Sequence, residues 1–151
     1  MEFSSYITGF VDGEGSFLVS FSKRSKLSVG IEVRPAFALS QHKRNKDILM
    51  RISAYFGCGG IRYSKRDQNY KYEVRSLRDL WEYIIPFFTT HPLHTSKQKD
   101  FELFKEICRI MRQNRHLSKD GIEDIISLAY MMNNLGARRY TKEQLLRIVA
   151  R

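Results

Sequence analysis

The sequence is poor in the residues that build metal or membrane sites. Its 151 residues include only two cysteines, Cys58 and Cys108, which lie far apart and lack the paired spacing of a zinc site. The four histidines show no metal-ligand spacing that further ligands support. No apolar run approaches the length of a transmembrane helix, and no basic segment precedes an apolar one at the start. These absences predict an intracellular, soluble protein with reduced thiols, in a bacterial or archaeal cytoplasm or in an organelle.

Negative charge is also scarce. Lys and Arg number 26 against 16 Asp and Glu, a formal net charge of +10. Such an excess favours nucleic acid as the partner over a membrane surface. The hydrophobic content of 42% and the aromatic content of 13% predict a real core. We therefore expect a single domain over residues 1–151 that buries about 70% of the unfolded chain's surface.

The stretch from Tyr6 to Gly15 is the most informative one. Gly9 and Gly13 are four residues apart and share one side of any helix built there. Glycine costs a helix about 1 kcal/mol relative to alanine, so two on one side predict the close approach of another backbone. Glu14 follows where the helix should end, and a carboxylate there requires a nearby cation. A solvated acid after an ordinary helix end is the alternative.

After Gly15 the spacing of the apolar residues changes from that of a helix to the alternation of a strand. Alternation predicts two hairpins, over residues 16–40 and 61–75, with Pro35 at a bulge or an unpaired edge. Helical patterns follow each hairpin, and Pro86 is expected to end the second of these helices. Three further helices are predicted at 96–113, after Ser118 and after Thr141. The order αββαββα with a helical tail predicts an α+β fold, in which helices cover one face of a four-stranded antiparallel sheet.

The other face of this sheet is polar and biased toward cations. A two-stranded ribbon fits the DNA major groove, where arginine can bond guanine and a carboxylate can accept from cytosine. A plain solvated face is the alternative. Loop lysines beside the face would hold phosphates. The predicted DNA-binding residues are Ser20, Ser22, Arg24, Lys26, Glu32, Arg34, Ser40, Lys43, Arg62, Ser64, Arg66, Lys71, Glu73 and Arg75. Further cations that could reach phosphates, each more typical of a solvated charge, are Arg112, Arg115, Lys119, Arg138 and Arg139.

The segment Ile7-Thr8-Gly9-Phe10-Val11-Asp12-Gly13-Glu14-Gly15 resembles the signature of the LAGLIDADG homing endonucleases, with Ile7-Thr8 in place of leucine-alanine. The family also has this order of elements. Four further passages are similar to family members: residues 37–43, 55–59, 95–101 and 116–122. Single-motif chains of the family form homodimers, and two-motif chains imitate a dimer internally. This chain has one motif and is most similar to one half of the two-motif members, so it is either a natural homodimer or half of a longer parent.

The resemblance implies a site-specific homing endonuclease of intron-homing type that cuts both strands of a long, pseudo-palindromic double-stranded DNA target. It implies catalytic roles for Glu14, Gln41 and Lys97. Glu14 and the carbonyl of Gly13 would bind magnesium, for which manganese would substitute. The implied dimer interface comprises Tyr6, Gly9, Phe10 and Gly13. The alternatives are an intron-splicing maturase, which would also bind RNA, a non-cleaving DNA-binding regulator of the same fold, and a structural nucleic-acid binder that uses only its charge.

Overall fold

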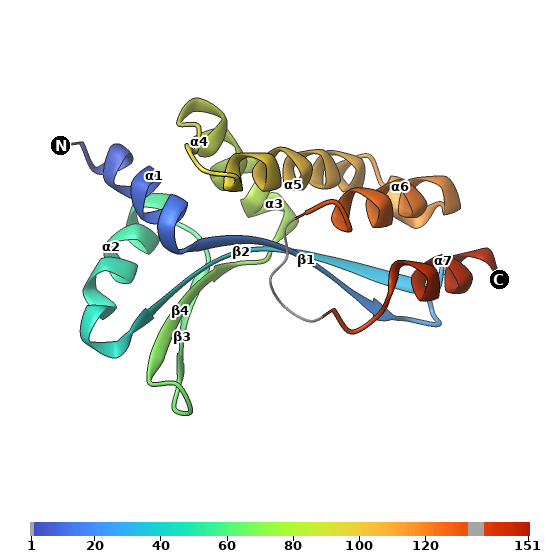
Figure 1. Ribbon diagram of the computed structural model, residues 1–151, viewed down its shortest axis with the longest axis horizontal. Helices are drawn as coiled ribbons and strands as arrows, with labels where there is room; N and C mark the ends of the chain where they lie inside the picture. Colours follow the sequence, from blue (N-terminus) through green and yellow to red (C-terminus); the bar gives the residue numbers. More distant parts are fainter. Residues whose placement is uncertain (1, 133–137) are drawn as a thin grey trace. The chain divides into compact units, whose positions relative to one another are not determined.

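The structure is a computed structural model that describes residues 2–132 and 138–151. Four strands form one sheet in the order β1-β2-β4-β3. The strands are β1 (Gly15–Lys23), β2 (Ile31–His42), β3 (Gly60–Ser64) and β4 (Asn69–Val74) (Figure 1). The chain divides into two compact units, of which unit 1 comprises Met1–Phe17 and Ala36–Gln98, and unit 2 comprises Leu18–Pro35 and Lys99–Arg151. The antiparallel sheet and the element order confirm the predicted α+β fold.

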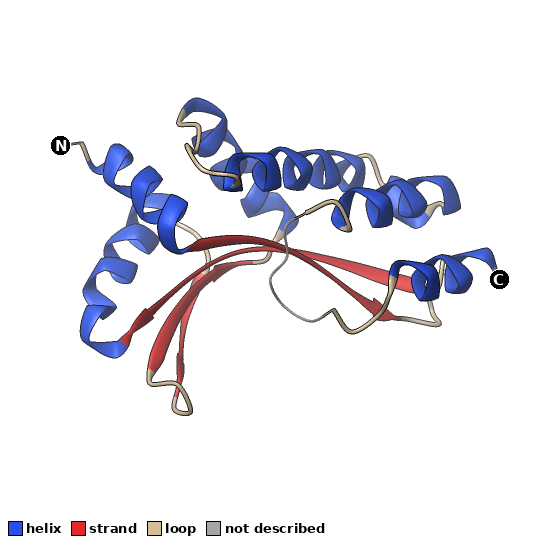
Figure 2. Ribbon diagram, viewed as in Figure 1, coloured by secondary structure: helices blue, strands red, loops and turns tan. Residues whose placement is uncertain are grey.

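Helices of unit 1 cover the apolar face of its strands (Figure 2). The first two are α1 (Phe3–Glu14) and α2 (Lys46–Phe56). On the sheet, Leu39 pairs with Tyr72 and both are fully buried, as the predicted alternation requires. Aromatic rings fill the space above them, with Phe37 lying 6.2 Å from Phe56 between ring centroids. The core of unit 1 is therefore an aromatic cluster on one face of the sheet.

Pro86 does not end the helix that follows β4, so this part of the prediction was wrong. Helical structure runs through α3 (Leu77–Asp79), a π-helical turn (Leu80–Ile84) and α4 (Ile85–Thr90). Proline in a regular α-helix clashes with the carbonyl four residues back. Here the N–H of Ile85 donates to the carbonyl of Leu80, five residues back. We attribute the continuation to this wider turn, which replaces the tight turn that the ring of Pro86 would disrupt.

Unit 2 joins the far part of the β1–β2 hairpin to the C-terminal helices. These are α5 (Lys97–Arg112), which starts in unit 1, α6 (Lys119–Ala129) and α7 (Lys142–Ala150). The helices predicted after Ser118 and Thr141 are present: Ser118 caps α6, and Thr141 with Gln144 forms a capping box at the start of α7. Within the described ranges, no helix combines the length and the apolar character needed to cross a membrane.

Arg138 is a structural anchor of unit 2. Its guanidinium donates to the carbonyls of Val19 on β1, at 3.0 Å, and Ala129 at the end of α6, at 2.8 Å. The same group lies 4.5 Å from the ring centroid of Tyr130. The interpretation of Arg138 as a solvated or phosphate-binding charge was therefore wrong, because its donors are bound to backbone oxygens inside the unit.

Pro35 is buried within β2. The first residue of β2 that pairs with β4 is Phe37, so Pro35 lies before the stretch that this neighbour covers. Between β2 and β4 the missing N–H of Pro35 therefore interrupts no pair, and the predicted bulge or unpaired edge stays a prediction.

Candidate functional site

Glu14 is the last residue of α1, and its side chain is exposed. The chain turns directly from α1 into β1 at Gly15. A Cβ atom at Gly15 would lie 2.7 Å from Cγ1 of Val11 and 3.2 Å from Cδ2 of Leu39. A larger residue therefore could not make this transition without displacing its neighbours. The sharp turn leaves the carboxylate of Glu14 at the tip of the helix, as predicted.

Lys97 supplies a cation at the same helix end. Its Nζ donates to the carbonyl of Val11 at 3.0 Å and to that of Asp12 at 3.2 Å. These carbonyls belong to the last turn of α1, which carries partial negative charge. The structure thus brings two of the predicted catalytic residues, Glu14 and Lys97, to one helix tip. The catalytic role of Lys97 itself stays a prediction.

Asp12 fastens the segment before α5 to α1. Its carboxylate accepts from the backbone N–H of His94 at 2.6 Å, and from the N–H and Oγ1 of Thr95 at 3.1 and 2.6 Å. Burial opposes ionisation of Asp12, but the hydrogen bonds from Thr95 and His94 outweigh it and lower its pKa below 3.8. At neutral pH the group is an anionic clamp that holds Lys97 beside the tip of α1.

From the sequence, Asp12 is expected only as part of the signature segment, and no role is predicted for Thr95. No local pattern indicates this contact, because the two residues are 83 positions apart. The only signal was the presence of a second carboxylate in the last turn of the helix, two residues before Glu14, where an acid without a partner is unfavourable.

Gln41 lies near the end of β2, opposite Tyr70 on β4. Its Oε1 accepts from Nδ2 of Asn45 at 3.1 Å, which orients the amide. Strand alternation places Gln41 on the same face as Leu39, the face that the helices cover. Its proposed part in catalysis stays a prediction.

The predicted interface residues form an open face on α1. The rings of Tyr6 and Phe10 stack with centroids 6.0 Å apart, and the side chain of Tyr6 is 40% exposed. Apart from the backbone of α1 itself and the adjacent residues, a Cβ atom at Gly9 or Gly13 would meet no atom within 4 Å. Packing inside the described part of the chain therefore does not explain why these two positions are glycine.

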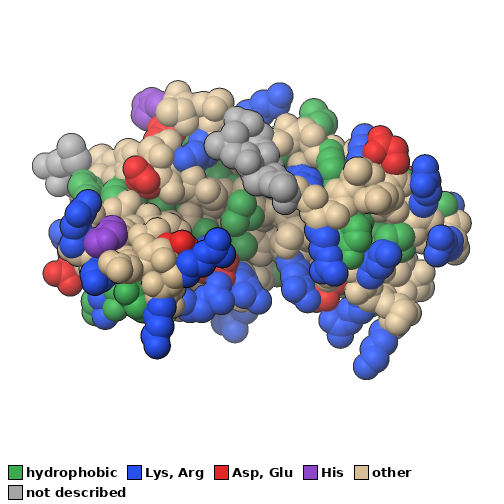
Figure 3. Space-filling model, turned by 60° about the horizontal axis from the view of Figure 1, so that its bottom comes forward, with side chains coloured by type: hydrophobic (Ala, Val, Ile, Leu, Met, Phe, Trp, Pro, Cys, Tyr) green, Lys and Arg blue, Asp and Glu red, His purple; other side chains and the backbone are tan. Residues whose placement is uncertain are grey.

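The polar face of unit 1 is organised around Glu73 on β4. Its carboxylate lies 3.1 Å from Arg62, 3.3 Å from Lys71 and 3.6 Å from Arg75. Arg66 belongs to the turn between β3 and β4 rather than to a strand, contrary to its predicted place on the sheet face. On the face turned forward in Figure 3, Lys and Arg side chains outnumber Asp and Glu.

In unit 2, Glu32 lies among cations in the same way as Glu73 does in unit 1. Its Oε2 lies 3.2 Å from Arg24 and 3.3 Å from Arg34. The loop lysines predicted to hold phosphates, Lys26 and Lys43, are exposed. The remaining predicted residues of this face are exposed or half-buried: Ser20, Ser22, Ser40 and Ser64. A ligand could therefore reach these predicted residues. Glu32 and Glu73, however, are already ion-paired with arginines and a lysine of the chain.

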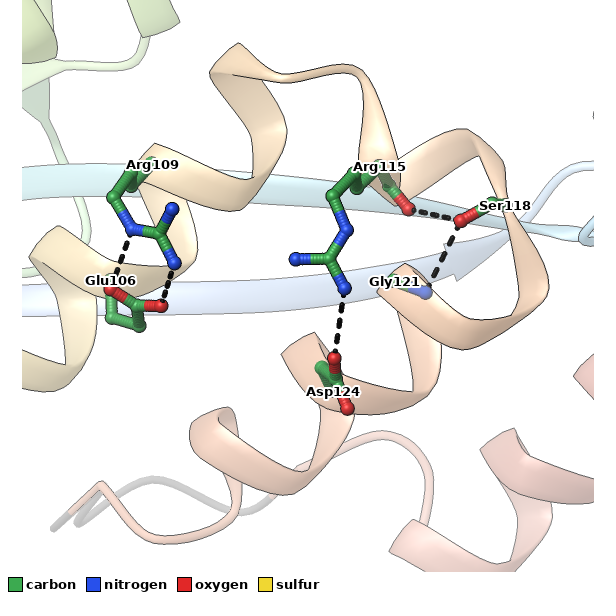
Figure 4. Close-up of polar contacts among 6 residues, drawn as sticks. All are labelled: Glu106, Arg109, Arg115, Ser118, Gly121 and Asp124. Carbon is green, nitrogen blue, oxygen red and sulfur yellow. Dashed lines mark hydrogen bonds and ion pairs between the residues drawn. The ribbon is translucent and has the colours of Figure 1, made fainter.

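Some cations of the C-terminal helices are already paired (Figure 4). Arg115 donates to Asp124 at 3.1 Å, and Arg109 pairs with Glu106 one turn before it on α5. Gly121 follows the Ser118 cap, and a Cβ atom there would lie 1.8 Å from the carbonyl oxygen of Arg115. Arg115 is therefore part of the joint between α5 and α6, which makes a phosphate contact from it less favourable.

A model of the family described as LAGLIDADG endonuclease matches residues 7–108, which includes most of α1, all four strands and most of α5. The chain belongs to the LAGLIDADG endonuclease family. Among solved structures, it is 35% identical to the homing endonuclease I-TnaI, with a TM-score of 0.85, 97% of this chain covered and 95% of that one. The likeness therefore extends to the whole fold.

Two other relatives differ in how much of their length this LAGLIDADG chain covers. It is 32% identical to I-SmaMI bound to uncleaved DNA in the presence of calcium ions, with a TM-score of 0.86, covering 95% of this chain but 47% of that one. It is 31% identical to "Probable intron-encoded endonuclease 2" of Neurospora crassa, covering 85% of this chain and 29% of that protein. The chain thus spans about half or less of these longer relatives.

Proposed function

We propose that this chain is a site-specific homing endonuclease that acts as a homodimer and makes a divalent-metal-dependent double-strand break in a long, pseudo-palindromic DNA target. The two units would work together as one domain over residues 1–151. The observation that carries the proposal is the exposed carboxylate of Glu14 at a helix tip that Lys97 and Asp12 brace. Both I-TnaI and I-SmaMI, which share this fold, are described as homing endonucleases.

Two features support a dimer. The chain matches 47% of the I-SmaMI chain in its DNA complex, so two copies correspond to one such chain. The open face of α1 with Gly9 and Gly13 is suited to a second α1 helix that crosses close to it. A twofold axis through this crossing would make the contact self-complementary. Each copy would then contribute its Glu14 to one side of the axis.

The residues at the helix tip fit a hard divalent cation only when two copies are combined. In residues 2–132 and 138–151, no group of three or more His, Cys, Asp or Glu side chains could hold a metal. Two Glu14 carboxylates and the carbonyls of Gly13 supply oxygen ligands, and magnesium takes few protein ligands when it also binds water and phosphate. Manganese would substitute. When bound, the metal would lower the pKa of an attacking water and stabilise negative charge on the phosphate.

The chain's own residues would then divide the work. Glu14 holds the cation at the scissile phosphate. Lys97, fixed on the carbonyls of Val11 and Asp12, offsets the negative charge that develops there. Gln41, oriented by Asn45, positions solvent through its amide. The polar sheet faces of the two copies would contact the two halves of the DNA target.

A cleavage assay tests the proposal. Purified protein is mixed with magnesium and a plasmid library of randomised inserts, and linear products are sequenced. We expect a recurring double-strand break that disappears with EDTA and with Glu14→Gln, while Glu14→Gln still binds the selected site. Glu143→Gln, which removes an exposed charge at the start of α7, is the matched control and should cut normally. Specific binding by the wild type without cleavage would instead support the non-cleaving regulator.

A further inference from the structure

The carboxylate of Glu73 is enclosed by the cations around it. Its side chain is 12% exposed, whereas Arg62, Arg75 and Lys71 around it are 67%, 62% and 39% exposed. The acid therefore lies beneath the basic groups, closer to the sheet. A ligand that approaches this face meets the guanidinium groups first.

The register of the sheet explains how an acid can lie so low. Glu73 pairs with Gly60 on β3 and with Ala38 on β2. Both neighbours across the strands are therefore the smallest residues. Directly opposed residues on neighbouring strands have Cβ atoms about 5 Å apart, so small side chains there leave room for the carboxylate against the backbone. Arg62, opposite Lys71, can then reach sideways over it.

Glu32 repeats the arrangement in unit 2. One of its oxygens, Oε2, serves both Arg24 and Arg34, whose side chains are 51% and 57% exposed against 29% for the acid. The hydrogen bond from Arg24, aided by Arg34, outweighs the opposing effect of burial and lowers the pKa of Glu32 below 4.5. The group is therefore an anion at neutral pH and holds both arginines.

We propose that Glu32 and Glu73 are positioning residues for sequence discrimination, which fix the arginines of the DNA-facing surface and do not contact bases themselves. The inference rests on the proposed function, because it assumes that this face binds DNA. An acid on a DNA-binding face repels phosphates, so it must contribute something other than affinity. A bidentate arginine contact with guanine needs a fixed guanidinium plane, and an ion pair that holds the plane beforehand reduces the rotamer freedom lost on binding.

This role differs measurably from direct base reading. If Glu73 accepted a hydrogen bond from a cytosine, then Glu73→Gln would change the preference at that base pair alone. If it fixes Arg62 and Arg75, the variant relaxes the positions that those arginines read. Loss of one negative charge should also leave unchanged, or increase, the affinity for unrelated DNA at low salt.

The test uses the full chain and a randomised duplex library, with EDTA present so that binding is measured without cleavage. Wild type, Glu32→Gln, Glu73→Gln and Glu73→Asp each select duplexes, and affinities for the wild-type site and for an unrelated duplex of equal length are compared at two salt concentrations. Glu143→Gln controls for the loss of one charge. Thermal melting of each variant shows first that it is folded.

We expect Glu73→Gln to reduce the ratio of specific to unrelated affinity about 10-fold, the scale of one good bidentate contact, with no loss of unrelated binding. Glu32→Gln should do the same at different base positions, because it holds different arginines. Glu73→Asp keeps the charge on a shorter stem and should restore part of the ratio. Glu143→Gln should match the wild type.

Two results would overturn the inference while leaving the proposed function intact. One is a Glu73→Gln protein whose selected sequences equal those of the wild type. The other is a variant that changes one base preference alone, which would identify Glu73 as a base reader. A wild type that selects no sequence would instead refute the proposed function, and this inference with it. Should Glu73→Gln not melt cooperatively, Glu32→Gln decides the question in the other unit.

Discussion

Replacing Gly9 by alanine should change two free energies in opposite directions. Gly9 lies in the middle of α1, and its backbone is not in the left-handed region that some other glycines of the chain occupy. Apart from the backbone of α1 and the adjacent residues, an added Cβ would meet no atom within 4 Å. Glycine in a helix interior costs about 1 kcal/mol relative to alanine, so Gly9→Ala should stabilise the isolated chain by about that amount.

In the proposed dimer the same methyl group is added twice, once on each side of the twofold axis. Overpacking at a close contact costs about 1–3 kcal/mol, and about 1.4 kcal/mol corresponds to tenfold in an equilibrium constant. Counted once, for the single crossing at which the two methyl groups meet, this cost should weaken dimerisation of Gly9→Ala about 5- to 150-fold. Leucine has a larger side chain than alanine and a similar helix propensity, so Gly9→Leu should abolish dimerisation.

The assay combines sedimentation, which measures the association constant, with urea unfolding over a range of protein concentrations. The concentration series is needed because dimerisation itself stabilises the folded chain. Gly15→Ala is the matched control within the signature, since its Cβ would lie 2.7 Å from Cγ1 of Val11 and should destabilise the chain itself. If Gly9→Leu dimerises as the wild type does, then α1 is not the interface. If Gly9→Ala destabilises the monomer, then α1 has an intrachain contact that the structure lacks.

Three further predictions concern the chain itself. Arg138→Met should destabilise unit 2 by about 2–4 kcal/mol in urea unfolding, because two carbonyls lose their donor. Arg139→Met should change the stability little. Equal effects of the two substitutions would contradict the anchoring role of Arg138. The pKa of Asp12 is lowered on folding, so the stabilising contribution of this carboxylate is present above pH 3.8, its ordinary pKa, and is lost as pH falls through the lower pKa of the folded state. Asp12→Asn should therefore lose less stability in acid than the wild type does. A variant with the same dependence of stability on pH as the wild type would refute the clamp. Burial raises the pKa of the Cys108 thiol to about 12, so it should not react with maleimide at neutral pH until urea unfolds the chain. Rapid labelling of the native protein would contradict the burial of Cys108.

Local patterns were sufficient for most of the fold. Alternation predicted a hairpin over residues 61–75, and in its second strand the alternate residues Tyr72 and Val74 are fully buried. The capping signals at Ser118 and Thr141 identified the starts of two helices, because each depends on residues within three positions. Pro86 shows where local rules fail. Its usual effect assumes a regular helix before it, and the sequence does not indicate the π-helical turn that is present instead.

The long-range contacts that brace the candidate site and that anchor unit 2 could not be predicted in the same way. Lys97 and Val11 are 86 positions apart, and Arg138 and Val19 are 119 apart. A charged residue looks the same in sequence whether it contacts water, a phosphate or a buried carbonyl. The resemblance to the family indicated that Lys97 belongs near Glu14, but it did not indicate that the ammonium is held by the carbonyls of α1.

Glu32 and Glu73 show why composition predicts that a protein binds DNA better than it predicts which surface recognises the DNA sequence. The net charge of +10 attracts phosphates whatever the arrangement of its members. Sequence specificity, however, is a difference between affinities, and a mobile cation binds the correct and the incorrect duplex equally well. Whether an arginine is fixed depends on which acid lies beside it, and for Glu73 that depends on the register that places Gly60 and Ala38 opposite it. Substituting leucine for Ala38 should therefore raise the carboxylate of Glu73 from the sheet and reduce discrimination, although no charge is changed. Equal discrimination by Ala38→Leu and the wild type, measured with the same duplexes, would show that the depth of the carboxylate does not matter.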